Sequence, residues 1–163
     1  MNIAQTLSGS GVHLSCEVFP PKEFARVDEA KAVVRDIAAL GPAYVSVTYG
    51  AAGKTPQFTR ELAQTAQEGG VTALAHLTCI NDTVDKIGDV LADLQQAGVT
   101  NVLALRGDIP EGASFPTGEH FEHAAQLVSH VKARGGFCVG AACYPEGHPE
   151  AGRRASDLDY LRS

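Results

Sequence analysis

Two carboxylates stand in or beside apolar runs typical of buried strands, where they could take part in acid–base chemistry. Glu17 lies within VHLSCEVF, residues 12–19, and Asp108 follows NVLALR, residues 101–106. Burial among apolar side chains raises the pKa of a carboxyl group, so we expect the pKa of Glu17 to lie above its usual range. Such a group suits general acid catalysis. The alternative is an ordinary strand glutamate facing solvent, since Ser15 and Glu17 share one strand face.

Polar residues stand at or just beyond the end of every strand-like run. The runs begin near residues 12, 43, 71, 101 and 136, which is a spacing of about thirty residues. That spacing matches a strand followed by a crossover helix. The polar residues and one glycine at these ends are Glu17, Thr48, Tyr49, His76, Thr78, Arg106, Gly107, Asp108, Tyr144 and His148.

Between these runs, apolar residues recur at helical spacing, as in Val27, Val34 and Ile37. Glycines follow such stretches at Gly41 and Gly98, where helices are expected to end. Five βα units are therefore predicted in one α/β domain that covers residues 1–163.

Parallel strands covered by helices form either an open doubly wound sheet or a (β/α)8 TIM barrel. The first run is followed by Pro20 and Pro21, and not by the Gly-x-Gly-x-x-Gly of a dinucleotide-binding sheet. Polar residues gathered at strand ends favour the barrel. Because a whole barrel takes about 250 residues, five units form an incomplete one. Either the chain is part of a longer protein or a partner copy covers the open edges.

Composition excludes several classes of function. The chain has 163 residues, 44% of them apolar, and a formal net charge of −6, so nucleic acid is not expected as a partner. No apolar run approaches the roughly 20 residues that span a bilayer, and the N-terminus lacks the pattern of a signal peptide. We expect a cytoplasmic protein without a membrane partner. The four cysteines have no metal-ligand spacing and are expected to be buried thiols.

A metal site is the main chemical alternative. Glu17, His76, Asp108 and His148 carry imidazole and carboxylate groups, which suit zinc or iron. Their separations in sequence form no known ligand signature, so no metal is predicted. A metal-dependent aldolase or hydrolase is retained as an alternative.

Five segments, in this order, resemble methylenetetrahydrofolate reductase. They are SCEVFPPK (15–22), YVSVTYGAAG (44–53), AHLTCI (75–80), VLALRGDIP (102–110) and AACYPEGHPEA (141–151). The resemblance implies a (β/α)8 barrel that binds FAD and reduces 5,10-methylenetetrahydrofolate to 5-methyltetrahydrofolate, with NADH or NADPH as donor. That activity belongs to one-carbon metabolism, in tetrahydrofolate interconversion and methionine biosynthesis.

The resemblance also implies roles for individual residues. Glu17 would be the general acid that helps to open the imidazolidine ring of the folate, giving the iminium that accepts hydride. Asp108 would lie near flavin N1 and the folate and tune the flavin potential. Arg106 and the backbone of Gly107 would contact the flavin. Without the resemblance, Arg106 and Asp108 could equally form a structural ion pair.

Further FAD contacts are implied at Thr48, His76, Ala142, Tyr144, His148 and Asp157. For His76 the alternative is a hydrogen-bonded core histidine. For Tyr144 and His148 it is a proline-rich loop whose aromatic ring caps the barrel.

The resemblance implies that the rest of the barrel and much of the folate and nicotinamide site lie beyond the fifth unit. A non-catalytic half-barrel that binds FAD weakly or assembles with another chain is therefore a second hypothesis. Because an open parallel sheet exposes apolar edges, homo-oligomers or poor solubility are expected.

Overall fold

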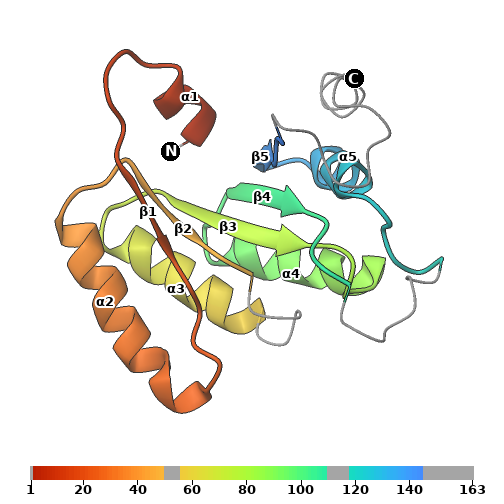
Figure 1. Ribbon diagram of the computed structural model, residues 1–163, viewed down its shortest axis with the longest axis horizontal. Coiled ribbons are helices and arrows are strands. Elements are labelled where there is room, and N and C mark those ends of the chain that lie inside the picture. The colour runs from red at the N-terminus through yellow and green to blue at the C-terminus, as the bar shows by residue number, and fades with distance from the viewer. Residues whose placement is uncertain (1, 50–55, 110–117, 145–163) are drawn as a thin grey trace.

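In the computed structural model, residues 2–49, 56–109 and 118–144 are described, and they form one parallel sheet of five strands (Figure 1). The strands are β1 (Ser15–Val18), β2 (Tyr44–Val47), β3 (Ala73–Thr78), β4 (Asn101–Leu105) and β5 (Cys138–Ala141). Their order in the sheet is the order along the chain, and every pair is parallel. An open dinucleotide-binding sheet reverses its strand order partway, whereas a barrel does not. The α/β fold of a partial barrel is thus confirmed.

A helix follows each of the first four strands. These helices are α2 (Val27–Ala39), α3 (Pro56–Glu68), α4 (Val84–Gln96) and α5 (Ala124–Arg134), and a short 3-10 helix, η1 (Phe24–Arg26), precedes α2. Figure 1 shows α2, α3 and α4 along the same face of the sheet. None of the helices in the described part of the chain is both long and apolar enough to cross a membrane. The helix expected after β5 falls in residues 145–163, outside the described residues.

Alternation along the strands gives the sheet two different faces. Val45 and Val47 of β2 are fully buried, as are Ala75 and Leu77 of β3. Leu77 belongs to the same hydrophobic cluster as helix residues of α3, α4 and α5. The residues that alternate with these, Tyr44, Ser46, Leu74 and His76, line the cavity on the opposite side of the sheet. The hydrophobic core therefore lies between the sheet and its helices, and the other face is free to carry polar groups.

A short helix, α1 (Ile3–Leu7), lies on the opposite side of the sheet from α2, α3 and α4 (Figure 1). The Ile3 amide donates to Oδ1 of Asn101 at 3.0 Å, at the beginning of β4. Asn101 Nδ2 donates in turn to the Ala73 carbonyl oxygen at 3.3 Å. Asn101 is 1% exposed, so these bonds are buried and hold α1 against the amino ends of β3 and β4. The sequence analysis had not predicted this helix.

Candidate functional site

The face of the sheet opposite the four covering helices borders a cavity of about 480 Å³. That volume lies within the range of small-molecule sites. The lining residues come from all five strands and from α1, and include Glu17, Ser46, His76, Asn101, Leu103 and Cys138. Because they are far apart in sequence, only the curvature and register of the sheet bring them together.

Glu17, Ser46 and His76 form the polar part of this cavity. The parallel register pairs Glu17 with Ser46, and Ser46 Oγ donates to Glu17 Oε2 at 3.3 Å. His76 Nε2 lies 3.5 Å from the same oxygen. The structure thus brings together two predicted site residues, Glu17 and His76, which come from β1 and β3.

The expected apolar setting of Glu17 is wrong. Its side chain is 47% exposed, and the flanking Leu14 and Phe19 are each 71% exposed. Its neighbours in space are a hydroxyl and an imidazole, which the residues adjacent in sequence do not reveal. Glu17 is therefore a reachable carboxylate with two polar neighbours, and not a carboxyl group in an apolar pocket.

His76 is 8% exposed, and burial lowers its pKa because the charged imidazolium is poorly solvated there. The Glu17 carboxylate opposes this shift but has the smaller influence. A lowered pKa means that the imidazole is neutral at neutral pH. In that form one ring nitrogen donates a hydrogen bond and the other accepts one.

We expect the stability of the protein to fall as the pH drops below about 6.5, the pKa of an ordinary histidine. Below that value the unfolded chain binds a proton on His76 more readily than the folded chain does, so acid favours unfolding. Denaturant unfolding at about pH 7.5 and 5.5 measures this loss, and His76→Gln should make it smaller. An unchanged loss in His76→Gln would show that other groups cause it.

The predicted cofactor residues Thr48, Arg106, Gly107 and Asp108 lie at the carboxyl ends of β2 and β4. The Thr48 amide donates to the Val18 carbonyl oxygen at 3.0 Å, and the Thr48 carbonyl oxygen accepts from Thr59 Oγ1 at 3.0 Å. Arg106 and Gly107 are partly buried, whereas Asp108 is exposed. These positions fit a loop that begins where the sheet ends.

Gly107 has a φ of +85°, a conformation that side chains other than glycine rarely adopt. A Cβ atom at this position would lie 3.0 Å from Thr78 Cβ. Glycine therefore lets the exit of β4 turn close against the exit of β3.

Of the four other residues predicted to contact FAD, two lie within the described part of the chain. Ala142 is partly buried and Tyr144 is 41% exposed, and both follow β5 directly. His148 and Asp157 lie outside the described residues. The structure does not test the roles assigned to these four residues.

The prediction of four buried thiols is wrong in part. Cys79 is buried, Cys16 and Cys138 are partly exposed and Cys143 is exposed, and all four are free. Burial raises the pKa of Cys79 to about 11, so this thiol is protonated and unreactive at neutral pH. Cys143 follows the short strand β5 at the open edge of the sheet, which the local run of β-forming residues did not reveal.

Within residues 2–49, 56–109 and 118–144, no three His, Cys, Asp or Glu side chains cluster closely enough to hold a metal ion. Glu17 and His76 meet as a pair. His148, the fourth residue considered for a metal set, is outside those ranges.

Ser46 is a site residue that the sequence analysis missed. A signal for it was available, because Ser46 lies in the predicted strand two positions before Thr48, and residues two apart in a strand share a face. The register that places it beside Glu17 could not be read from either strand alone.

The sequence also matches a known protein family and several of its members. The sequence model of the family described as methylenetetrahydrofolate reductase matches residues 2–163. A 5,10-methylenetetrahydrofolate reductase from Pectobacterium carotovorum subsp. carotovorum is 34% identical over 152 residues, covering 93% of this chain and 50% of the relative. The corresponding Escherichia coli (strain K12) protein is 33% identical over 152 residues, with the same coverage.

A probable methylenetetrahydrofolate reductase (NADH) from Oryza sativa subsp. japonica is 39% identical over 142 residues, or 84% of this chain and 24% of the relative. The chain therefore spans about half the length of the bacterial relatives and about a quarter of the rice protein. Since the family model matches the chain almost from end to end, the chain belongs to the methylenetetrahydrofolate reductase family.

Proposed function

We propose that this chain is a single FAD-binding domain of barrel type, acting in the reduction of 5,10-methylenetetrahydrofolate to 5-methyltetrahydrofolate. NADH or NADPH is the electron donor, and the reaction belongs to cytoplasmic one-carbon metabolism. Family membership supports this activity, and the four free thiols suit a reducing compartment.

One observation carries the proposal: a reachable carboxylate, Glu17, stands in the cavity with Ser46 and His76 beside one of its oxygens. Opening the folate ring requires a proton on a ring nitrogen, and Glu17 in its protonated form would donate it and become the carboxylate. Ser46 and His76 fix the position of Oε2. Glu17 is still exposed enough to contact a ligand in the cavity.

The ends of β2, β3 and β4 suit a flavin. They carry the Thr48 hydroxyl, the His76 imidazole and the Arg106 guanidinium, and Gly107 lets the exit of β4 turn close against Thr78 of β3. Hydroxyl, imidazole and guanidinium groups can donate to carbonyl and phosphate oxygens, which FAD has in number. FAD, when bound, supplies the hydride chemistry between the nicotinamide donor and the folate. Asp108 would place a negative charge near that cofactor.

The first experiment is a titration of the purified chain with FAD, followed by the absorbance of the flavin bands. We expect saturable binding with shifted bands, and we expect Gly107→Ala to weaken binding roughly tenfold, since the new Cβ strains the exit of β4. Gly88→Ala is the matched control, because a Cβ at Gly88 in α4 meets nothing within 4 Å. Absence of binding in a folded chain would contradict the cofactor assignment.

A second candidate function is a non-catalytic half-barrel that assembles with another copy or another chain. The observation in its favour is the exposure of apolar residues beside β1, where Val12 is 99%, Leu14 71% and Phe19 71% exposed. A parallel sheet is normally covered on both faces and at its edges. Assembly would remove this apolar surface from water.

A further inference from the structure

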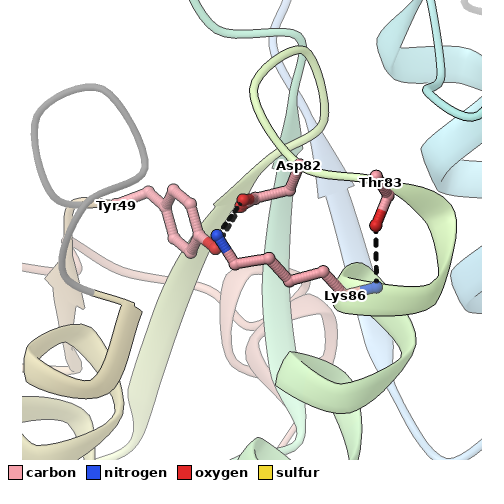
Figure 2. Close-up of polar contacts among 4 residues, drawn as sticks. All are labelled: Tyr49, Asp82, Thr83 and Lys86. Carbon is pink, nitrogen blue, oxygen red and sulfur yellow. Dashed lines mark hydrogen bonds and ion pairs between the residues drawn. The ribbon is translucent and has the colours of Figure 1, made fainter.

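A buried carboxylate lies outside the cavity, among groups that the proposed reaction does not use. The side chain of Asp82 is 1% exposed. Its Oδ2 accepts a hydrogen bond from the Tyr49 hydroxyl at 2.7 Å, and its Oδ1 pairs with the Lys86 ammonium group (Figure 2). Tyr49 directly follows Thr48 at the end of β2, and Asp82 stands between β3 and α4. The carboxylate therefore joins two successive strand exits.

The same connector also contacts the exit of β4. The Ile80 amide donates to the Arg106 carbonyl oxygen at 2.9 Å, and Asn81 Nδ2 donates to the Asp108 carbonyl oxygen at 3.4 Å. Residues 79–82 are thus bonded to the exit of β2 on one side and to the exit of β4 on the other. We call these four residues the exit connector.

The hydrogen bond between Tyr49 and Asp82 does not depend on pH in the ordinary range. Burial raises the pKa of Tyr49, and the hydrogen bond to Asp82 raises it further, so the phenol always carries its proton and donates. A buried carboxylate without partners would be costly, and here both oxygens have one.

Lys86 has an unusual position for a lysine, because it lies in the first turn of α4. A cation there opposes the helix dipole. Thr83 fixes this turn, since its Oγ1 accepts from the Lys86 amide at 3.3 Å (Figure 2). The pair with Asp82 offsets the unfavourable position, which ties the start of α4 to the exit connector.

We propose that Asp82 is a positioning residue, which through Tyr49 and the exit connector sets the spacing between Thr48 at the exit of β2 and Arg106 to Asp108 at the exit of β4. These are the residues assigned to the flavin, so this inference rests on the proposed function. The Asp82 side chain is buried and does not line the cavity, so we expect no direct contact with the ligand. Its effect on binding is exerted through the backbone of the two exits.

The decisive variant is Tyr49→Phe, which removes the hydroxyl and leaves the ring and the Asp82–Lys86 pair in place. We expect its dissociation constant for FAD to rise roughly tenfold, the effect of losing a buried hydrogen bond to a charged group. The visible circular dichroism of bound flavin should change as well. Asp82→Asn, which keeps the shape of the side chain but removes its charge, should also raise the dissociation constant for FAD.

Leu94→Ala separates positioning from general stability. Leu94 is 2% exposed and lies near the far end of α4 from the exit connector, so this variant lowers the melting temperature without touching the strand exits. We expect it to bind FAD within about twofold of the unmodified chain, measured below its melting temperature. If FAD affinity instead follows melting temperature across the three variants, the positioning role is overturned.

Amide hydrogen exchange tests the same inference without a cofactor. In Tyr49→Phe the amides of Thr48 and Ile80 should exchange at least tenfold faster, while those of Val45 and Val102 keep their rates. A chain that binds no FAD but shows this pattern would contradict the proposed cofactor and support the connector. Unchanged exchange at Thr48 and Ile80 would overturn the role of Asp82, whatever the cofactor.

Discussion

Glu17→Gln is expected to lower the rate at which methylenetetrahydrofolate oxidises the reduced cofactor by roughly 10²- to 10⁴-fold, the usual contribution of a general acid. Glutamine keeps the size of the side chain and an oxygen for the Ser46 hydroxyl, but it has no acidic proton to give. Reduction of the cofactor by the nicotinamide donor needs no such proton and should keep its rate. Stopped-flow absorbance of the two half-reactions measures both effects separately.

Ser46→Ala is the matched control for this prediction. It removes one hydrogen bond to Glu17 Oε2 and leaves the carboxyl group, so the folate half-reaction should slow by roughly tenfold at most. A Glu17→Gln variant with the unmodified rate would exclude Glu17 as the acid. If the unmodified chain binds FAD but does not react with the folate at all, the half-barrel function is favoured.

Leu77→Ala is expected to lower the free energy of unfolding by about 2–5 kcal/mol, the cost of a cavity in a well-packed core. Leu77 is fully buried on the helix side of β3. Against a total stability of roughly 5–15 kcal/mol, a loss of this size leaves a marginal protein. Urea unfolding followed by circular dichroism measures it.

Leu74→Ala makes the same chemical change on the opposite face of the same strand. Leu74 lines the cavity and is only partly buried, so its loss should cost clearly less than that of Leu77. Equal costs would mean that another chain covers the cavity face, and sedimentation should then show oligomers. A stable monomer in sedimentation would contradict assembly.

Much of the fold could be predicted because it depends on the order of apolar and polar residues within short segments. Val45 and Val47 alternate with Tyr44 and Ser46, which marks a strand with one apolar and one polar face. All five predicted strands exist, although each is shorter than the apolar run that indicated it; β1, for example, covers Ser15–Val18 within the run 12–19. The repeat of about thirty residues predicted parallel strands, and the polar residues at the strand ends favoured the barrel, in which strand order follows the chain.

The parts that could not be predicted depend on contacts between distant residues. The Tyr49–Asp82 bond joins residues 33 positions apart, and no spacing in the sequence marks it. Glu17 is a second example. Its neighbours in sequence are apolar, but the groups beside its carboxylate are the Ser46 hydroxyl and the His76 imidazole, which come from other strands. Side-chain surroundings follow from strand register and sheet curvature, which are properties of the assembled sheet.

The buried bond between the Ile3 amide and Asn101 has a consequence for folding during synthesis. Each strand pairs with the one made just before it, so the sheet can grow in the order in which the chain leaves the ribosome. The first helix is different, since its partner is made 98 residues later. Contacts of such long range form late because closing the long loop costs entropy. The helix α1 therefore docks late although its residues are made before the whole sheet, and until then the amino ends of β3 and β4 are open to solvent.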